Sequence, residues 1–202
     1  MEPLLLATAC FPPIAYMAEM IHSGSAQIEI HETYKKQTCR NHYVIYGPNG
    51  RQVLSIPVKK PEGNRTKTRD ILIDYDKPWK KIHWRSVETA YNNSPFFLYY
   101  RDPVELFFHE EHDSLAAYNF SILKKLLQIL GFTDKINFSV TTEFHPAGKD
   151  AKKEILVSKH YHPSLPVYFQ PFSPKHGFIS NLSILDCLFN LGPEAGSYLA
   201  GV

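Results

Sequence analysis

The feature that most narrows the fold is a strand–helix–strand pattern in the first thirty residues. An apolar run covers residues 3–9, and a second β-prone run covers residues 26–30. Apolar residues recur at helical spacing between them, with Pro13 suited to the first helical turn and Gly24 to the end of the helix. Strands joined by one helix lie parallel in a sheet. The pattern therefore predicts a mixed α/β fold that opens with a βαβ unit, with an α+β fold as the alternative.

A hairpin is predicted next, because the turn sequence GPNG at residues 47–50 lies between two β-prone runs. If residues 34–46 are extended, Lys36, Arg40 and His42 share one face of the strand. The preceding parallel strands end nearby, at residues 10–13 and 31–34, and ligands bind at such an edge. Lys36 and Arg40 would be about 13 Å apart, which suits a diphosphate. The alternative is a solvated row of charges that protects an edge strand.

Residues 78–93 predict an amphipathic helix that carries His83 within its apolar stripe, with Tyr91 and Asn93 at its end. A histidine in that position is either a hydrogen-bonded core residue or a proton-transfer group that faces a cleft. The second interpretation is open because the reference pKa of histidine suits general base catalysis near neutral pH.

A nearly all-apolar helix is predicted over residues 180–192, with Ser180 or Asn181 as its cap. One polar line remains on this helix, made of Ser183, Asp186 and Asn190. A carboxylate on a buried helix is costly unless it is paired. We therefore expect a partner for Asp186, either a cation of the early strand or His83. The alternative is a helix cap or a structural ion pair.

Composition limits the classes of protein that remain. The chain has 202 residues with a net charge of +2, which fits one domain over residues 1–202 and disfavours a nucleic-acid binder. Its three cysteines are far apart, so no disulfide framework or structural zinc site is predicted. No apolar run is long enough to predict a membrane span, and a cytoplasmic location is expected.

The remaining segments carry less information about chemistry. A helix is predicted over residues 114–130 and a strand over residues 135–144, followed by a loop-rich stretch over residues 145–166. Residues 59–70 hold five cations with Pro and Gly and predict a mobile surface loop, which leaves a lid open as an interpretation. No nucleotide-binding or metalloenzyme motif occurs, and the HEEH sequence at residues 109–112 lacks a third ligand. Neither a cofactor nor a metal is expected.

Four stretches of the chain, in order, resemble the WbqC-like protein family and together cover nearly its whole length. They are residues 9–20, 28–58, 73–97 and 177–199. The resemblance implies a role in the synthesis of bacterial surface polysaccharides such as O-antigen, where decoration of sugars, including transfer of glycine, has been proposed for the family. The positions that share the family motifs are Lys36, Gln37, Arg40, Asn41, His83, Tyr91, Ser183, Asp186 and Asn190.

The chain also departs from the family pattern at two places. Leu6, Ala7 and Thr8 stand where many relatives have histidine, glutamine and proline, so a mechanism that needs that first histidine does not carry over. His42 stands where relatives often have arginine, which removes one fixed charge from the predicted anion-binding row.

The resulting hypothesis is a transferase that acts on a nucleotide-linked or lipid-linked sugar. His83 would be the general base, and Asp186 would orient His83 or neutralise a cation. The predicted substrate-binding residues are Lys36, Gln37, Arg40, Asn41, Tyr91, Asn93, Ser183 and Asn190. The alternative is a non-catalytic protein that binds glycan precursors or acts as a scaffold. Whether the chain is an enzyme, which donor and acceptor it uses, and its oligomeric state stay open at this stage.

Overall fold

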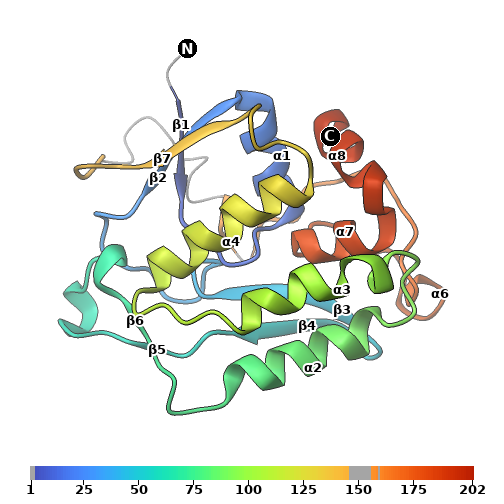
Figure 1. Ribbon diagram of the computed structural model, residues 1–202, viewed down its shortest axis with the longest axis horizontal. Helices are drawn as coiled ribbons and strands as arrows, with labels where there is room; N and C mark the ends of the chain where they lie inside the picture. Colours follow the sequence, from blue (N-terminus) through green and yellow to red (C-terminus); the bar gives the residue numbers. More distant parts are fainter. Residues whose placement is uncertain (1–2, 146–155, 159) are drawn as a thin grey trace.

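The computed structural model describes residues 3–145, 156–158 and 160–202. Strand β1 (Leu4–Ala7), helix α1 (Ile14–Ser23) and strand β2 (Ser25–Glu29) form the predicted parallel βαβ unit. Helix α1 ends at Gly24, whose φ of 65° is a left-handed conformation that glycine adopts without steric cost. Strand β7 (Asn137–Val140) pairs in parallel with the other side of β2, so the sheet order is β1-β2-β7 (Figure 1). The mixed α/β fold class is confirmed.

The predicted hairpin is formed by β3 (His42–Gly47) and β4 (Gly50–Ser55), which pair antiparallel. Its two faces differ because side chains alternate along each strand. Tyr43 and Leu54 pair across the ladder on one face, which is buried in the main core beside α2 (Trp79–Tyr91). The opposite face carries three cross-strand pairs: His42 with Ser55, Val44 with Val53, and Tyr46 with Arg51.

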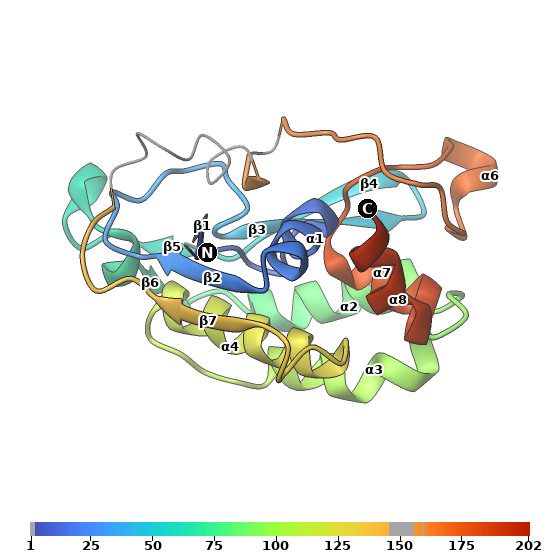
Figure 2. The same ribbon diagram turned by 90° about the horizontal axis from the view of Figure 1, so that it is seen from above.

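Helices pack around these sheets. In Figure 2, α2, α3 (Phe97–Glu105) and α4 (Leu115–Ile129) lie along one side of the molecule, and the segment that follows residue 160 runs along the other. Helices α7 (Ile184–Leu191) and α8 (Ala195–Gly201) pack against α1. The short elements are β5 (Val58–Lys59), β6 (Leu72–Ile73), α6 (Ser173–His176) and four 3₁₀ turns at Gly63–Arg65, Thr68–Asp70, Leu106–Phe108 and Gly192–Glu194. Over the described residues, no helix has the length and apolar character needed to cross a bilayer.

The prediction of an extended chain over residues 34–46 is wrong. The strand begins only at His42, and the preceding residues are irregular, with Gln37 at a φ of 57°. Two interactions bend the chain there: the Cys39 carbonyl accepts a hydrogen bond from the Cys10 amide, and the Cys39 amide donates to the Val157 carbonyl. The predicted row of Lys36, Arg40 and His42 on one strand face therefore does not form.

One further expectation is corrected in detail. Helix α7 is capped by Ser183 rather than by Ser180 or Asn181, because Asn181 adopts a φ of 53° and breaks the helical path. The basic loop at residues 59–70 is tied to the chain beside it by backbone hydrogen bonds, such as the one from the Tyr34 amide to the Thr66 carbonyl at 3.0 Å. Most of the loop-rich stretch predicted after residue 145 lies outside the described residues.

Candidate functional site

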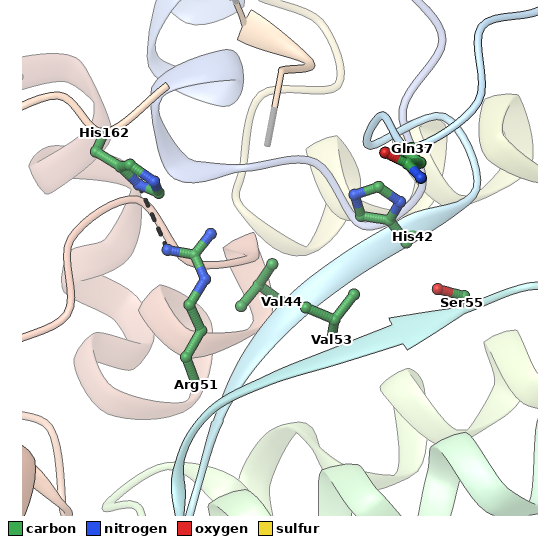
Figure 3. A pocket seen from close by; sticks show the side chains of 7 residues that line it. All are labelled: Gln37, His42, Val44, Arg51, Val53, Ser55 and His162. Atoms are coloured by element: carbon green, nitrogen blue, oxygen red, sulfur yellow. Dashed lines mark hydrogen bonds between the residues drawn. The ribbon is translucent and has the colours of Figure 1, made fainter. Parts of the chain in front are cut away.

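A hollow of about 500 Å³ lies over the outward face of the β3–β4 hairpin. We call it the hairpin hollow. Figure 3 shows Arg51 and His162 at one side, Gln37 and His42 at the other, and two valines between them. Its lining residues are Gln37, His42, Val44, Arg51, Val53, Ser55 and His162. The volume lies within the range typical of small-molecule sites.

The hollow continues inward as a narrow space of about 20 Å³ that shares His42, Val44 and Arg51 with the outer part. This inner end is built from the connection between β1 and α1 and from the start of α7. Phe11 and Pro13 come from the first, and Asn181 and Ser183 from the second; Cys39, Tyr43, Ser158 and Tyr161 complete the lining. The carboxyl end of β1 thus reaches the hollow, as the βαβ topology leads one to expect of a ligand site.

Backbone strain is concentrated around this hollow. In the described part of the chain, the non-glycine residues with positive φ are Phe11 at 39°, Gln37 at 57° and Asn181 at 53°. All three line the hollow or its inner end. Such conformations cost about 1–3 kcal/mol each and gather at functional sites, where the surrounding structure holds them in place. For a bulky aromatic residue such as Phe11 the conformation is a true outlier.

Hydrogen bonds hold the strained residues in place. The Asn181 side chain accepts from the Ala15 amide at 2.9 Å and donates to the Tyr161 carbonyl at 3.1 Å. The Ser183 hydroxyl donates to the Phe11 carbonyl at 3.0 Å while it caps α7. The start of α7 is therefore fastened to the β1–α1 connection, and the inner end of the hollow is rigid.

The polar groups of the outer hollow stand on opposite sides of an apolar floor. Arg51 donates to Nδ1 of His162 over 3.4 Å, an arrangement that leaves the proton of a neutral His162 on Nε2. His42 is largely buried, with 7% exposure, and lies directly across the ladder from Ser55. The hollow therefore offers a fixed positive charge at one end and an imidazole at the other.

His83, predicted as the general base, lies beside this hollow rather than in it. Its Nδ1 is 3.2 Å from the Tyr43 hydroxyl, and Tyr43 lines the inner end. Burial lowers the pKa of His83 to about 4, so the ring is neutral at pH 7 and a weak base. His83 also lines a separate open cavity of about 460 Å³ together with Lys77 and Trp79.

Asp186 is fully buried, and its contacts correct the expectation of a cationic partner. Its Oδ2 accepts hydrogen bonds from the Tyr168 hydroxyl at 2.5 Å and the Gln170 amide at 2.9 Å, both of which are neutral donors. Tyr91 and Asn190 lie close enough to lower its pKa, but desolvation outweighs them and raises the pKa of Asp186 to about 6. Among the described residues, Oδ1 has no partner that meets hydrogen-bond geometry.

Arg40 is also fully buried, and its guanidinium contacts other buried groups rather than a cavity. Its Nη2 forms an ion pair with Glu32 Oε1 at 2.6 Å, and its Nε donates to the same oxygen at 3.0 Å. The Arg40 carbonyl accepts from the Asn119 amide on α4 at 2.7 Å. Among the described residues, Arg40 thus forms hydrogen bonds with Glu32, whereas Asp186 forms them with Tyr168 and Gln170. Neither Arg40 nor Asp186 lines the hairpin hollow.

The other predicted site residues are divided between the hollow and its surroundings. Gln37 and Ser183 line it, whereas Lys36 and Asn93 are exposed elsewhere. Three serve nearby structure: Asn41 donates to the Ile56 carbonyl, Asn190 donates to the Asp186 carbonyl, and the Tyr91 hydroxyl accepts from the Tyr46 amide. The hollow therefore brings together only part of the predicted set.

Sequence reasoning missed Arg51 and His162. The signal for Arg51 was present, because a two-residue turn sets the register and pairs Arg51 with Tyr46 on the His42 face. His162 had no such signal, since it reaches the hollow from a segment without regular secondary structure, far along the chain.

Fold and site together define a mixed α/β protein in which a helix-backed hairpin supplies the floor of a ligand-sized hollow. The chain belongs to the WbqC-like protein family, whose model matches residues 8–162. This span begins just after β1 and contains α1, β2, the hairpin and His162, so it covers most of the hollow.

A relative from Mycobacterium tuberculosis (strain ATCC 25618 / H37Rv), the uncharacterized protein Rv1507c, is 26% identical over 220 residues. The alignment covers 94% of this chain and 90% of the relative, so the two are similar over almost their full lengths. No solved structure matches the chain.

Proposed function

We propose that the chain is a transferase that attaches an acyl group, such as a glycyl group, to a nucleotide- or lipid-linked sugar in bacterial surface-polysaccharide synthesis. Membership of the WbqC-like family supports this biological setting. The observation that carries the proposal is the placement of Arg51 and His42 at opposite ends of one hollow, surrounded by strained backbone. Strain of this kind is a feature of ligand clamps and active sites.

Arg51 is the proposed anion-binding residue. A guanidinium can donate two parallel hydrogen bonds to a phosphate or carboxylate, which fixes the orientation of the ligand as well as its charge. Arg51 faces Tyr46 across the ladder, four positions along β3 from His42, so the two backbones are about 13 Å apart. That distance suits a substrate whose anionic part and reacting hydroxyl group are several bonds apart, as in a sugar phosphate.

His42 is the proposed general base. A sugar hydroxyl would attack the carbonyl carbon of an activated acyl donor, His42 would take the hydroxyl proton, and a new ester bond would form. The bond from the acyl carbon to the donor's leaving group would break, and the leaving group would depart with the electron pair. General base catalysis needs the imidazole within hydrogen-bond reach of the hydroxyl. The apolar floor of Val44 and Val53 would limit access of water to the acyl donor.

His83 and Asp186 take supporting parts in this proposal. The Tyr43 hydroxyl lies between His83 and the inner hollow, so His83 acts as a positioning residue for Tyr43. Asp186 is too deeply buried to touch a substrate, and it fastens the segment around Tyr168 to α7. The role of base passes from His83 to His42 because His42 lines the hairpin hollow, whereas His83 lies beside it with its ring next to the Tyr43 hydroxyl.

The test is a thermal-shift screen with UDP-, GDP- and dTDP-sugars, followed by mass spectrometry of sugars incubated with glycyl-coenzyme A. We expect Arg51→Ala to weaken binding by about tenfold, since a hydrogen bond to a charged group contributes about 1.5–3 kcal/mol. His42→Gln should keep binding and lose turnover by about 10²–10⁴-fold. Arg85→Ala, which removes an exposed cation of α2, is the matched control.

The outcomes separate the two classes of function. Binding that depends on Arg51, without turnover for any acyl donor, would instead support a non-catalytic glycan-precursor binding protein or scaffold. Binding that is the same in the Arg51→Ala variant and the wild type would rule out the hairpin hollow as the substrate site.

A further inference from the structure

A second groove lies between helix α4 and the edge strand β7, and none of its lining residues belongs to the hairpin hollow. It consists of a cavity of about 550 Å³ and an adjoining one of about 220 Å³, which share Phe120 and Lys124. The proposed transferase reaction makes no use of this groove.

The groove has apolar walls. Helix α4 turns Ala117, Phe120 and Leu127 toward it at helical spacing. From the sheet, the Phe138 ring lies 5.0 Å from the Phe120 ring, and Val140 remains 40% exposed at the open edge. A concave site of about 550 Å³ with mostly apolar walls and a few polar groups is typical of small-molecule binding sites.

Two cations, Arg69 and Lys124, line the same groove. Lys124 makes no ion pair with any described residue, whereas Arg69 contacts Asp70 at 3.5 Å and His31 at 3.0 Å. The remaining polar lining residues are His112, Ser114, Ser121 and Thr133.

The carboxylate of Glu110 lies next to the groove, since it contacts two of the lining residues, the Ser121 hydroxyl and His112 Nε2. Its charge is met by an ion pair with Lys125. The groove therefore combines an apolar channel with a net positive lining.

We propose that this groove binds an amphiphile in which a hydrocarbon chain is joined to a phosphate. The chain would lie between Phe120, Phe138 and Val140, where it removes exposed apolar surface from water. The phosphate would contact Lys124 through a charge-assisted hydrogen bond, and Arg69, which lines the same groove, would add to the positive charge that attracts a phosphate dianion.

Isothermal titration calorimetry of the full chain with farnesyl phosphate tests the proposal, with farnesol, inorganic phosphate and decanoate as comparison ligands. Farnesyl phosphate should bind at least about tenfold more tightly than each of the others, because only it supplies both the chain and the dianion. Lys124→Ala should weaken its binding by about tenfold, since a charge-assisted hydrogen bond is lost.

Ala117→Trp fills the channel from an exposed position of α4 and should abolish binding without disturbing the fold, which circular dichroism checks. Lys81→Ala removes an exposed cation of α2 that lines neither site, and it should leave binding unchanged. Equal affinity for farnesyl phosphate in the Ala117→Trp variant and the wild type would overturn the placement of the ligand. Equal affinity for farnesol or decanoate would overturn the role of the phosphate. Inorganic phosphate that binds as tightly as farnesyl phosphate would overturn the role of the chain.

Discussion

Asp186 and His83 are buried titratable side chains whose pKa values are displaced in opposite senses within the same pH range. Desolvation raises the pKa of Asp186 from 3.8 to about 6 and lowers the pKa of His83 from 6.5 to about 4. Burial disfavours the charged form of each, which for an acid means a higher pKa and for a base a lower one. Their contributions to folding stability consequently have opposite slopes with pH.

The Asp186→Asn variant tests how Asp186 makes the free energy of unfolding depend on pH. Because the folded state binds the Asp186 proton more tightly than the unfolded chain, its contribution to stability is lost as pH rises from 3.8 to about 6. The amide can still accept from Tyr168 and Gln170 through its oxygen. We therefore expect the variant to be more stable than the wild type by up to about 3 kcal/mol at pH 7.5.

Urea denaturation of both proteins between pH 3.5 and pH 8 provides the measurement. The difference in stability should be small at the acid end and grow through the range in which Asp186 ionises. A variant that is less stable than the wild type at pH 7.5 would show that the ionised carboxylate is stabilising.

The His83→Gln variant tests how His83 makes the free energy of unfolding depend on pH. Between about pH 4 and pH 6.5, the unfolded chain binds a proton at His83 and the folded state does not. The contribution of His83 to the stability of the wild type therefore decreases as the pH is lowered. In the variant, the gain in stability that Asp186 gives as the pH is lowered is no longer cancelled by the loss that His83 causes. The stability of the variant relative to the wild type should therefore increase as pH is lowered from 6.5 to 4, measured by the same denaturation series. A constant difference across that range would contradict the lowered pKa.

At the scale of single elements, Gly24 and Gly192 each close a helix at a positive φ, but their surroundings differ. Gly24 closes α1 at a φ of 65° and has open space where a Cβ would stand. Gly192 closes α7 at a φ of 55°, and a Cβ there would meet the Phe96 ring, with Cδ2 at 2.7 Å. At Gly24 only the backbone conformation requires glycine. At Gly192 the close packing of α7 beside Phe96 requires it as well, and the Phe96 amide donates a hydrogen bond to the Phe189 carbonyl.

Alanine substitution at each glycine separates these two effects. Gly24→Ala should cost about 1–2 kcal/mol, the usual penalty for a left-handed residue with a Cβ. Gly192→Ala should cost about 2–6 kcal/mol. The φ of 55° and ψ of −123° at Gly192 lie outside the αL region and cost a residue with a Cβ about 1–3 kcal/mol, and overpacking against Phe96 adds about 1–3 kcal/mol. Chemical denaturation of the two variants measures the difference. Equal losses would show that the Phe96 ring moves aside at no cost.

At the scale of the whole molecule, one large core cluster joins the parallel sheet to the hairpin. It contains Leu6 and Ile28 from the sheet, Tyr43 and Leu54 from the hairpin, and Leu188 from α7. Because these parts bury their apolar surface against one another, we expect neither sheet to be stable without the other. A single domain over the chain stays a prediction, and this shared core is the physical reason to expect it.

Cooperative unfolding is the corresponding test. The two tryptophans, Trp79 and Trp84, both lie on α2 and report on the hairpin side, whereas far-UV circular dichroism reports on all helices. If one core holds both parts, the two signals should give the same midpoint and slope in urea. Separate midpoints would show that the hairpin with α2 unfolds independently of the parallel sheet.

Local chemistry was enough to predict the βαβ unit, the hairpin and the boundaries of α1, because apolar spacing, Pro13, Gly24 and the GPNG turn act over a few residues. The burial of the Ser183, Asp186 and Asn190 line also followed from an apolar helix. Long-range contacts decided the rest. Arg40 turns inward because Glu32 lies beside it, and this pairing depends on how the chain bends around Cys39. Asp186 meets Tyr168 and Gln170 only after a segment without regular structure packs against α7. Arg51 and His162 lie together for the same reason, since contacts between distant segments depend on tertiary packing, which no local pattern in the chain encodes.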